Sequence, residues 1–223
     1  MNMFLRKLAG FVLVSLFGCG FSSAQTAATP PIHVSDSWVY EDSNARTKRM
    51  SLLFLTTTAV NEKGAEVKRR TMDGRQVATL TFNKAGAQIA EDGYVNGIVK
   101  IPTTLAVGQT VTGPWSTKTG FSGKWKSTVA AQESVTVPAG TFQAWRIEYE
   151  SSGDGGFSAK QTLWFVPEVK QYVKQSTVLW PAGDRYLQEL VAFRVVGADT
   201  KILSATAPSI DQNQLAFMNA PVQ

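Results

Sequence analysis

The sequence predicts an all-β protein, folded as a curved antiparallel meander or a partly open β-barrel of roughly nine to eleven strands. Apolar and polar residues alternate with a period of two along most of the chain, and a helical period is almost absent. Turn sequences rich in Gly, Asp and Asn separate the alternating runs at regular intervals. No linker-like stretch interrupts this pattern between residues 35 and 197, so we expect a single antiparallel β domain there.

Residues 1–24 have the organisation of a signal peptide. Arg6 and Lys7 precede an apolar run from Leu8 to Phe17, and small residues then lead to a cleavage position after Ala24. The apolar run is shorter than the roughly 20 residues that a membrane-spanning helix needs. We therefore expect an exported protein, with the periplasm as its favoured location.

The segment LFGC, residues 16–19, offers a second processing route. It resembles the bacterial lipobox, in which the cysteine becomes the acylated first residue of a lipoprotein. Along this route Cys19 is the lipidation site and the protein is held at the outer membrane, whereas cleavage after Ala24 discards that cysteine. Cleavage is the favoured route, and contact with a membrane is expected only if Cys19 is lipidated.

The composition of the chain argues against several kinds of chemistry. Cys19 is the only cysteine, so cleavage after Ala24 leaves no disulfide, no thiol nucleophile and no thiolate metal site. Loss of residues 1–24 removes two basic residues and no acidic ones, which lowers the formal net charge from +5 to +3. A charge this modest does not indicate a nucleic acid partner.

The expected elements follow in order along the chain. Residues 25–34 are rich in small residues and proline, and we expect them to form a flexible leader. The run at 50–60 is apolar on both faces, as in a central strand, whereas later runs alternate between one dry and one wet face. The alternating runs are residues 75–82, 142–150 and 185–196. Residues 198–223 form a polar tail, which we expect to be disordered or loosely docked.

Catalytic constellations are scarce in this sequence. His33 is the only histidine and lies in the leader as an expected spacer residue, so neither a Ser-His-Asp triad nor a histidine zinc site is predicted. No motif for a nucleotide or another cofactor occurs. Glu148 and Glu150 would share one strand face about 6–7 Å apart, a separation also found between glycosidase carboxylates. A solvated face beside Arg146 gives the same spacing.

Tryptophans supply the candidate binding residues. Trp145 alternates with apolar neighbours and is assigned to the core. Trp115 and Trp125 flank a Gly- and Lys-rich turn, and Trp180 precedes a Pro-Ala-Gly turn. An exposed indole near a concave sheet would stack on a sugar or contact an acyl chain, and the alternative for each is simple packing.

Two segments resemble a family of exported bacterial β-rich proteins of unknown function. The segment VTVPAGTF at 135–142 matches the family's corner through Pro138, Gly140 and Phe142, and the segment after it matches through Trp164 and Pro167. The resemblance implies a curved antiparallel sheet or open barrel in the periplasm or outer-membrane space, without an agreed activity or catalytic residues. The sequence departs from the family at Lys170, where glycine is usual, and this puts the local turn geometry in doubt.

Two functions remain open on this evidence. The first is a non-enzymatic envelope protein that binds or assembles through the concave face of its curved sheet, with a lipid, a glycan or another protein as ligand. The alternative is a carboxylate-dependent hydrolase of envelope polysaccharide that uses Glu148 and Glu150. No cofactor and no metal are expected for either function.

Overall fold

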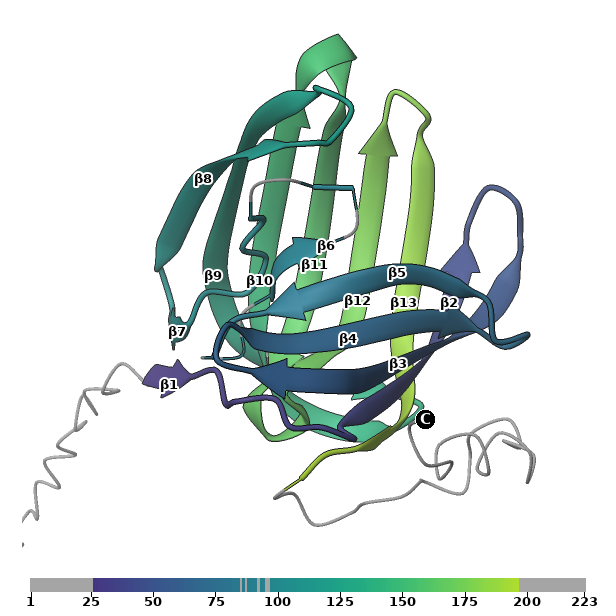
Figure 1. Ribbon diagram of the computed structural model, residues 1–223, viewed down its shortest axis with the longest axis vertical. Coiled ribbons are helices and arrows are strands. Elements are labelled where there is room, and N and C mark those ends of the chain that lie inside the picture. Colours follow the sequence, from purple (N-terminus) through teal and green to yellow (C-terminus); the bar gives the residue numbers. More distant parts are fainter. Residues whose placement is uncertain (1–25, 85, 87, 92, 95–96, 197–223) are drawn as a thin grey trace, which may run out of the picture.

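A computed structural model of the protein describes residues 26–84, 86, 88–91, 93–94 and 97–196 (Figure 1). The predicted signal peptide, the lipidation candidate Cys19 and the predicted tail at 198–223 lie outside these residues. Among the described residues, no helix has the length and hydropathy that are required to cross a membrane.

The described chain folds as one large antiparallel sheet with a small two-stranded sheet beside it. The large sheet contains the eleven strands β2 (Ser37–Asn44), β3 (Met50–Asn61), β4 (Gly64–Thr71), β5 (Gln76–Phe82), β6 (Gln88–Glu91), β8 (Thr110–Ser116), β9 (Ser122–Val137), β10 (Gly140–Gly153), β11 (Ser158–Val166), β12 (Gln171–Trp180) and β13 (Asp184–Arg194). The small sheet pairs β1 (Thr26–Ala28) with β7 (Thr104–Ala106). Two 3-10 turns, η1 (Asp154–Gly156) and η2 (Pro167–Val169), complete the fold.

The prediction of a curved antiparallel meander is confirmed. The strand order is β6-β5-β4-β3-β2-β13-β12-β11-β10-β9-β8, so two meanders meet where β2 pairs with β13 at the centre of the sheet. The sheet does not close into a barrel, because its edge strands β6 and β8 are not paired with each other. In Figure 1, β3, β4 and β5 cross in front of the long strands that form the back of the molecule.

The sheet bends at β2 into a front arm, β3 to β6, and a back arm, β8 to β13, and the core fills the concave side between them (Figure 1). The period of two places alternate residues of every strand on this side, where large side chains meet across the fold. The most deeply buried of them are Trp38, Tyr40, Leu55 and Phe82 from the front arm with β2, and Trp145, Ile147, Leu163, Phe165 and Leu190 from the back arm. Burial of these apolar side chains is the main force that keeps the sheet bent.

The connection from β6 to β8 closes part of the open side. Ile98, Ile101 and Leu105 are buried in the same core cluster as the strands. The hydroxyl of Ser127 on β9 donates to the carbonyl oxygen of Lys100 over 2.7 Å, which fastens the connection to the back arm. Residues 97–109 of this link, which the structure describes, therefore form a packed plug rather than a free loop.

The leader differs from its prediction as a flexible spacer. Thr26–Ala28 pairs with Thr104–Ala106, and the Thr29 amide donates to the Thr103 carbonyl over 3.1 Å. Ile32 is buried in the core. The prediction was wrong because both the strand pairing and the burial of Ile32 depend on residues far away in the chain. The local sequence, rich in small residues and proline, gives no sign of either.

The corner at 135–142 joins β9 to β10 through the two residues Pro138 and Ala139. Gly140 begins β10 with a φ of +135°, a value that side chains with a Cβ rarely adopt. The Ala139 amide donates to the Leu190 carbonyl over 2.9 Å, and Phe142 makes an edge contact with Phe193, their ring centres 6.2 Å apart. The corner thus packs onto β13.

Candidate functional site

Two of the three candidate binding tryptophans are packing residues. Trp115 is 5% exposed and Trp125 is 7% exposed, whereas Trp180 is 40% exposed. The Trp115 ring makes edge contacts with Tyr94 and Phe157, at 5.8 Å between ring centres in each case. These contacts leave little of the indole accessible to a ligand.

Glycines on neighbouring strands make room for these rings. A Cβ on Gly123 or Gly153 would lie 2.6 or 2.3 Å from the Trp115 ring, and one on Gly113 would lie 2.6 Å from the Trp125 ring. The Trp125 Nε1 donates to the carbonyl oxygens of Gly97 and Pro114 over 3.2 and 3.1 Å. The Gly-rich sequence around the tryptophans therefore serves close packing of rings against backbone.

Glu148 and Glu150 lie on the outer face of the sheet, because Tyr149 between them faces the core. Glu148 accepts hydrogen bonds of 2.9 Å from Arg146 Nη1 and from the Thr162 hydroxyl. Glu150 forms an exposed ion pair with Lys160 at 3.2 Å. The two carboxylates are partly exposed and already partnered, and they do not face each other across a closed site.

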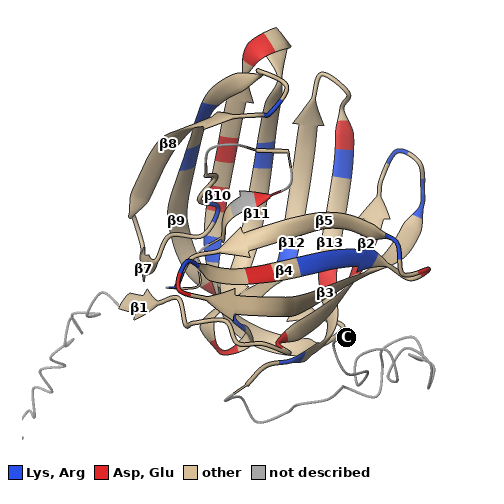
Figure 2. Ribbon diagram, in the orientation of Figure 1, with Lys and Arg blue, Asp and Glu red and all other residues tan. Residues whose placement is uncertain are grey.

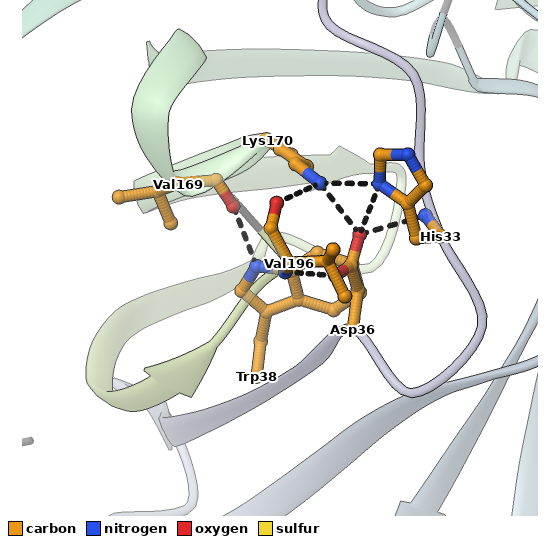
Figure 3. A network of polar contacts seen from close by, with 6 residues as sticks. All are labelled: His33, Asp36, Trp38, Val169, Lys170 and Val196. Carbon is orange, nitrogen blue, oxygen red and sulfur yellow. Dashed lines mark hydrogen bonds and ion pairs between the residues drawn. The ribbon is translucent and has the colours of Figure 1, made fainter. Parts of the chain in front are cut away.

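A buried polar cluster joins both ends of the described chain (Figure 3). Asp36 is fully buried, and its carboxylate accepts from Lys170 Nζ over 3.1 Å, from the His33 amide over 2.8 Å and from the Val196 amide over 2.7 Å. Lys170 Nζ also donates to the Val196 carbonyl over 2.8 Å and meets His33 Nδ1 at 2.7 Å. An ammonium has no acceptor, so Nδ1 of His33 accepts this bond.

This cluster is a structural clasp rather than a reactive site. The three donors of the Lys170 ammonium meet three acceptors, and both oxygens of Asp36 are used. The clasp holds the leader, η2 and the segment after β13 together. His33, whose side chain is 48% exposed, lies at the solvent edge of this network and contacts its buried ammonium, which corrects its assignment as a spacer residue.

The concave face contains a polar cleft of about 300 Å³ between the two arms. Its back wall includes a row of residues that lie opposite one another on β10, β11, β12 and β13, namely Tyr149, Gln161, Thr177 and Tyr186. Arg69 on β4, Glu91 on β6 and Lys100 in the plug complete the opposite wall. Apolar core residues lie deeper, so the cleft is the polar mouth of the concave face.

An ion-pair network forms one wall of this cleft. Glu91 pairs with Arg69 Nη2 at 2.9 Å and with Lys100 Nζ at 3.4 Å. Burial raises the pKa of the Glu91 carboxyl, but attraction to Lys100 and Arg69 outweighs burial and holds that pKa below its ordinary value. Glu91 is therefore ionised at neutral pH, and the two cations leave this wall with an excess positive charge.

Phenols and amides form the remaining polar surface. Burial raises the pKa of both Tyr149 and Tyr172, so their hydroxyls stay protonated and able to donate. The Tyr172 hydroxyl donates to Gln188 Oε1 over 3.0 Å, and Gln188 Nε2 donates to Asp42 over 2.9 Å. Gln161 differs, because its Oε1 is buried and has no hydrogen-bond partner among the described residues.

A larger groove of about 1,190 Å³ lies beside the corner at 135–142 and is lined by Phe142, Trp145, Pro167 and Phe193 among others. Its wall includes Gly140, Phe142 and Pro167, three of the residues through which the sequence resembles the family of exported β-rich proteins. No buried polar side-chain atom without a partner lines it in the described part of the chain. The groove shows where the motif residues lie without indicating a ligand.

No family model matches the sequence, and no curated protein matches it. Among solved structures, a protein inferred to be exported from Bacteroides fragilis, with a YmcC-like fold, is 11% identical with a TM-score of 0.46 and covers 75% of this chain and 99% of its own. An inferred lipoprotein from Parabacteroides distasonis is 13% identical, with a TM-score of 0.45 and the same coverages. The hypothetical lipoprotein YmcC from Escherichia coli is 14% identical, with a TM-score of 0.42 and coverages of 70% and 83%. At this level of similarity these proteins carry no inference about the activity of this chain.

The sequence did not single out the residues of the cleft. Gln161, Gln175 and Gln188 occupy inward positions on three strands, where the alternating pattern calls for apolar side chains. A polar residue at an inward position was therefore the available signal. In the described residues, no group of three or more His, Cys, Asp or Glu side chains could hold a metal ion.

Proposed function

We propose that the protein is an exported, non-enzymatic envelope protein that binds a short, hydroxyl-rich glycan in the concave cleft. The observation that carries this proposal is the buried, unpartnered Oε1 of Gln161 in the cleft wall. A buried acceptor without a donor costs about 1–3 kcal/mol. If the Gln161 amide turns toward the cleft, a ligand hydroxyl that donates to its Oε1 would recover that cost only in the bound state.

The chemistry of the cleft favours a glycan over the other ligand classes considered. Tyrosine rings offer apolar faces with donor hydroxyls, and glutamine amides match both donors and acceptors of a sugar. An acyl chain would desolvate Arg69, Glu91 and Lys100 without replacing their hydrogen bonds. A cleft of about 300 Å³ is at the lower end of small-molecule sites, which suits a small ligand rather than a protein surface.

The hydrolase alternative has less support. A glycosidase needs a protonated acid and a second carboxylate on either side of the bond that is cleaved. Glu91 is the single carboxylate among the described residues that line the cleft, and its pKa is lowered rather than raised. Glu148 and Glu150 lie on the outer face, so the proposal assigns no catalytic residue.

The variant Gln161→Leu tests the proposal directly. A glycan array with the purified protein identifies the ligand, and calorimetry then compares the wild type, Gln161→Leu and the exposed control Gln143→Leu. We expect Gln161→Leu to weaken binding about tenfold or more. Its melting temperature should stay equal or rise, because the variant removes an unpaired buried polar group.

Two results would overturn the proposal. One is unchanged glycan affinity in Gln161→Leu, which would mean that the amide does not meet the ligand. The other is a protein that binds no glycan and instead retains lipid in native mass spectrometry, which would favour the apolar groove beside the corner. Gln143→Leu should bind as tightly as the wild type, since Gln143 is exposed and lies outside the cleft.

A further inference from the structure

The outer face of the back arm carries a second groove, on the side of the sheet opposite the concave cleft. It has a volume of about 700 Å³ and is bounded by strands β8 to β11. Lys124, Lys126 and Lys160 line it together with Glu150. Figure 2 shows the basic segments of β9 and β11 on either side of an acidic segment of β10.

The strand register arranges these side chains as a grid. Lys126 lies opposite Glu150, and Glu150 lies opposite Lys160. In the neighbouring row, Lys124 lies opposite Ser152, which lies opposite Ser158. Glu150 thus lies between Lys126 and Lys160, and the short hydroxyl side chains of Ser152 and Ser158 form the floor beside it.

The spacing of the cations follows from sheet geometry. Lys124 and Lys126 are two residues apart on one strand, so their side chains leave the sheet about 6–7 Å apart. Lys126 and Lys160 are two strands apart, which separates them by about 9–10 Å. The three lysines therefore flank Glu150 and the hydroxyls of Ser152 and Ser158, and they are far enough apart to meet more than one anionic group of a polymer.

The charge of the grid is not balanced within the protein. Lys160 pairs with Glu150 at 3.2 Å, whereas the side chains of Lys124 and Lys126 make neither a hydrogen bond nor an ion pair with any described residue. Two like charges side by side on one strand repel each other. A bound polyanion would remove this repulsion and would meet the excess positive charge.

We infer that this outer groove binds an acidic polysaccharide that carries a carboxylate on its repeating units. The lysines would meet the carboxylates, and Ser152, Ser158 and Thr112 would exchange hydrogen bonds with sugar hydroxyls. This inference is independent of the proposed ligand of the concave cleft, because the two linings have only Ser151 and Ala159 in common and share neither Gln161 nor any lysine.

Binding of a fluorescent oligogalacturonate to the full chain tests the inference. We expect the wild type to bind, and a rise in NaCl from 50 to 200 mM should weaken binding because exposed charges are screened. The double variant Lys124→Glu/Lys126→Glu should bind about tenfold more weakly or worse. The matched control Lys63→Glu/Lys84→Glu changes the net charge equally at exposed positions elsewhere and should bind nearly as well as the wild type.

Other outcomes overturn the inference. Equal losses in the two double variants would mean that only net charge matters. Binding of neutral dextran with the same affinity would remove the role of carboxylates, and binding of polyphosphate but not oligogalacturonate would show a different polyanion. Gln161→Leu should bind oligogalacturonate as the wild type does, so failure at this groove is separable from failure at the concave cleft.

Discussion

A single buried side chain compensates for the presence of a lysine rather than a glycine at position 170. The position after η2 needs a left-handed backbone, and Lys170 has a φ of +60° where glycine would be relaxed. The buried Asp36 compensates for the strain, because it holds the Lys170 ammonium at 3.1 Å. The sequence shows that a lysine stands where glycine was expected. It does not show that the partner of Lys170 is Asp36, which lies 134 residues earlier, at the predicted start of the domain.

The clasp should be essential for stability. Lys170→Met leaves the buried Asp36 carboxylate without its counter-charge, and we expect the free energy of unfolding to fall by about 3–5 kcal/mol. Urea denaturation measures this loss. The double variant Asp36→Asn/Lys170→Met removes both charges and should regain at least about 1 kcal/mol over Lys170→Met.

A control for the clasp is available on the surface. Lys160→Met breaks the exposed pair with Glu150 and should cost less than about 1 kcal/mol. If Lys170→Met costs no more than Lys160→Met, then the buried cluster does not hold the chain ends together.

At the scale of elements, local pattern predicted strands well and their partners poorly. The period of two located the strands at 75–82 and 142–150, because each has one dry face. Nothing local indicates that β2 pairs with β13, since their residues are far apart in the chain and their register includes a bulge after Leu190. The pairing of Thr26–Ala28 with Thr104–Ala106 was missed for the same reason.

The corner between β9 and β10 should depend on Gly140. Its φ of +135° disfavours any residue with a Cβ, although a Cβ would find room, with its nearest neighbours 3.8 Å away on the Phe142 ring. We expect Gly140→Val to lower the free energy of unfolding by about 1–3 kcal/mol through backbone strain. Thermal or urea denaturation tests this.

The neighbouring residue supplies the control. Thr141 is exposed on the extended strand β10, so Thr141→Val should change stability by no more than about 0.5 kcal/mol. Equal melting temperatures of Gly140→Val and the wild type would contradict the assignment of strain to this corner.

At the scale of the molecule, the concave cleft exists because a bent sheet brings distant strands face to face. Its walls combine Arg69 and Glu91 with residues as far along the chain as Gln188. The sequence predicted the curvature and a concave face, but it selected Trp115 and Trp125 as ligand contacts. Both rings instead pack closely against Gly113, Gly123 and Gly153, although Trp125 also lines the outer groove, and this packing follows from the cross-strand register rather than from the local sequence.

The Glu91 network should make the fold sensitive to acid. Because its pKa in the folded protein is lowered, Glu91 stabilises the fold fully above the ordinary glutamate pKa of about 4.3. This stabilisation is lost as the pH falls through the lower pKa of the folded state. Glu91→Gln should therefore cost about 2 kcal/mol at pH 7, where it leaves Arg69 and Lys100 without their counter-charge.

The pH dependence separates this effect from a loss of packing. Urea denaturation of the wild type and Glu91→Gln should give curves of stability against pH that converge as the pH falls through the lowered pKa of Glu91, because a protonated Glu91 resembles glutamine. The exposed control Glu62→Gln should follow the wild type at every pH. A difference between the wild type and Glu91→Gln that stays constant down to pH 3 would contradict the electrostatic explanation. It would mean that Glu91 supports the plug between the two arms by its shape rather than by its charge.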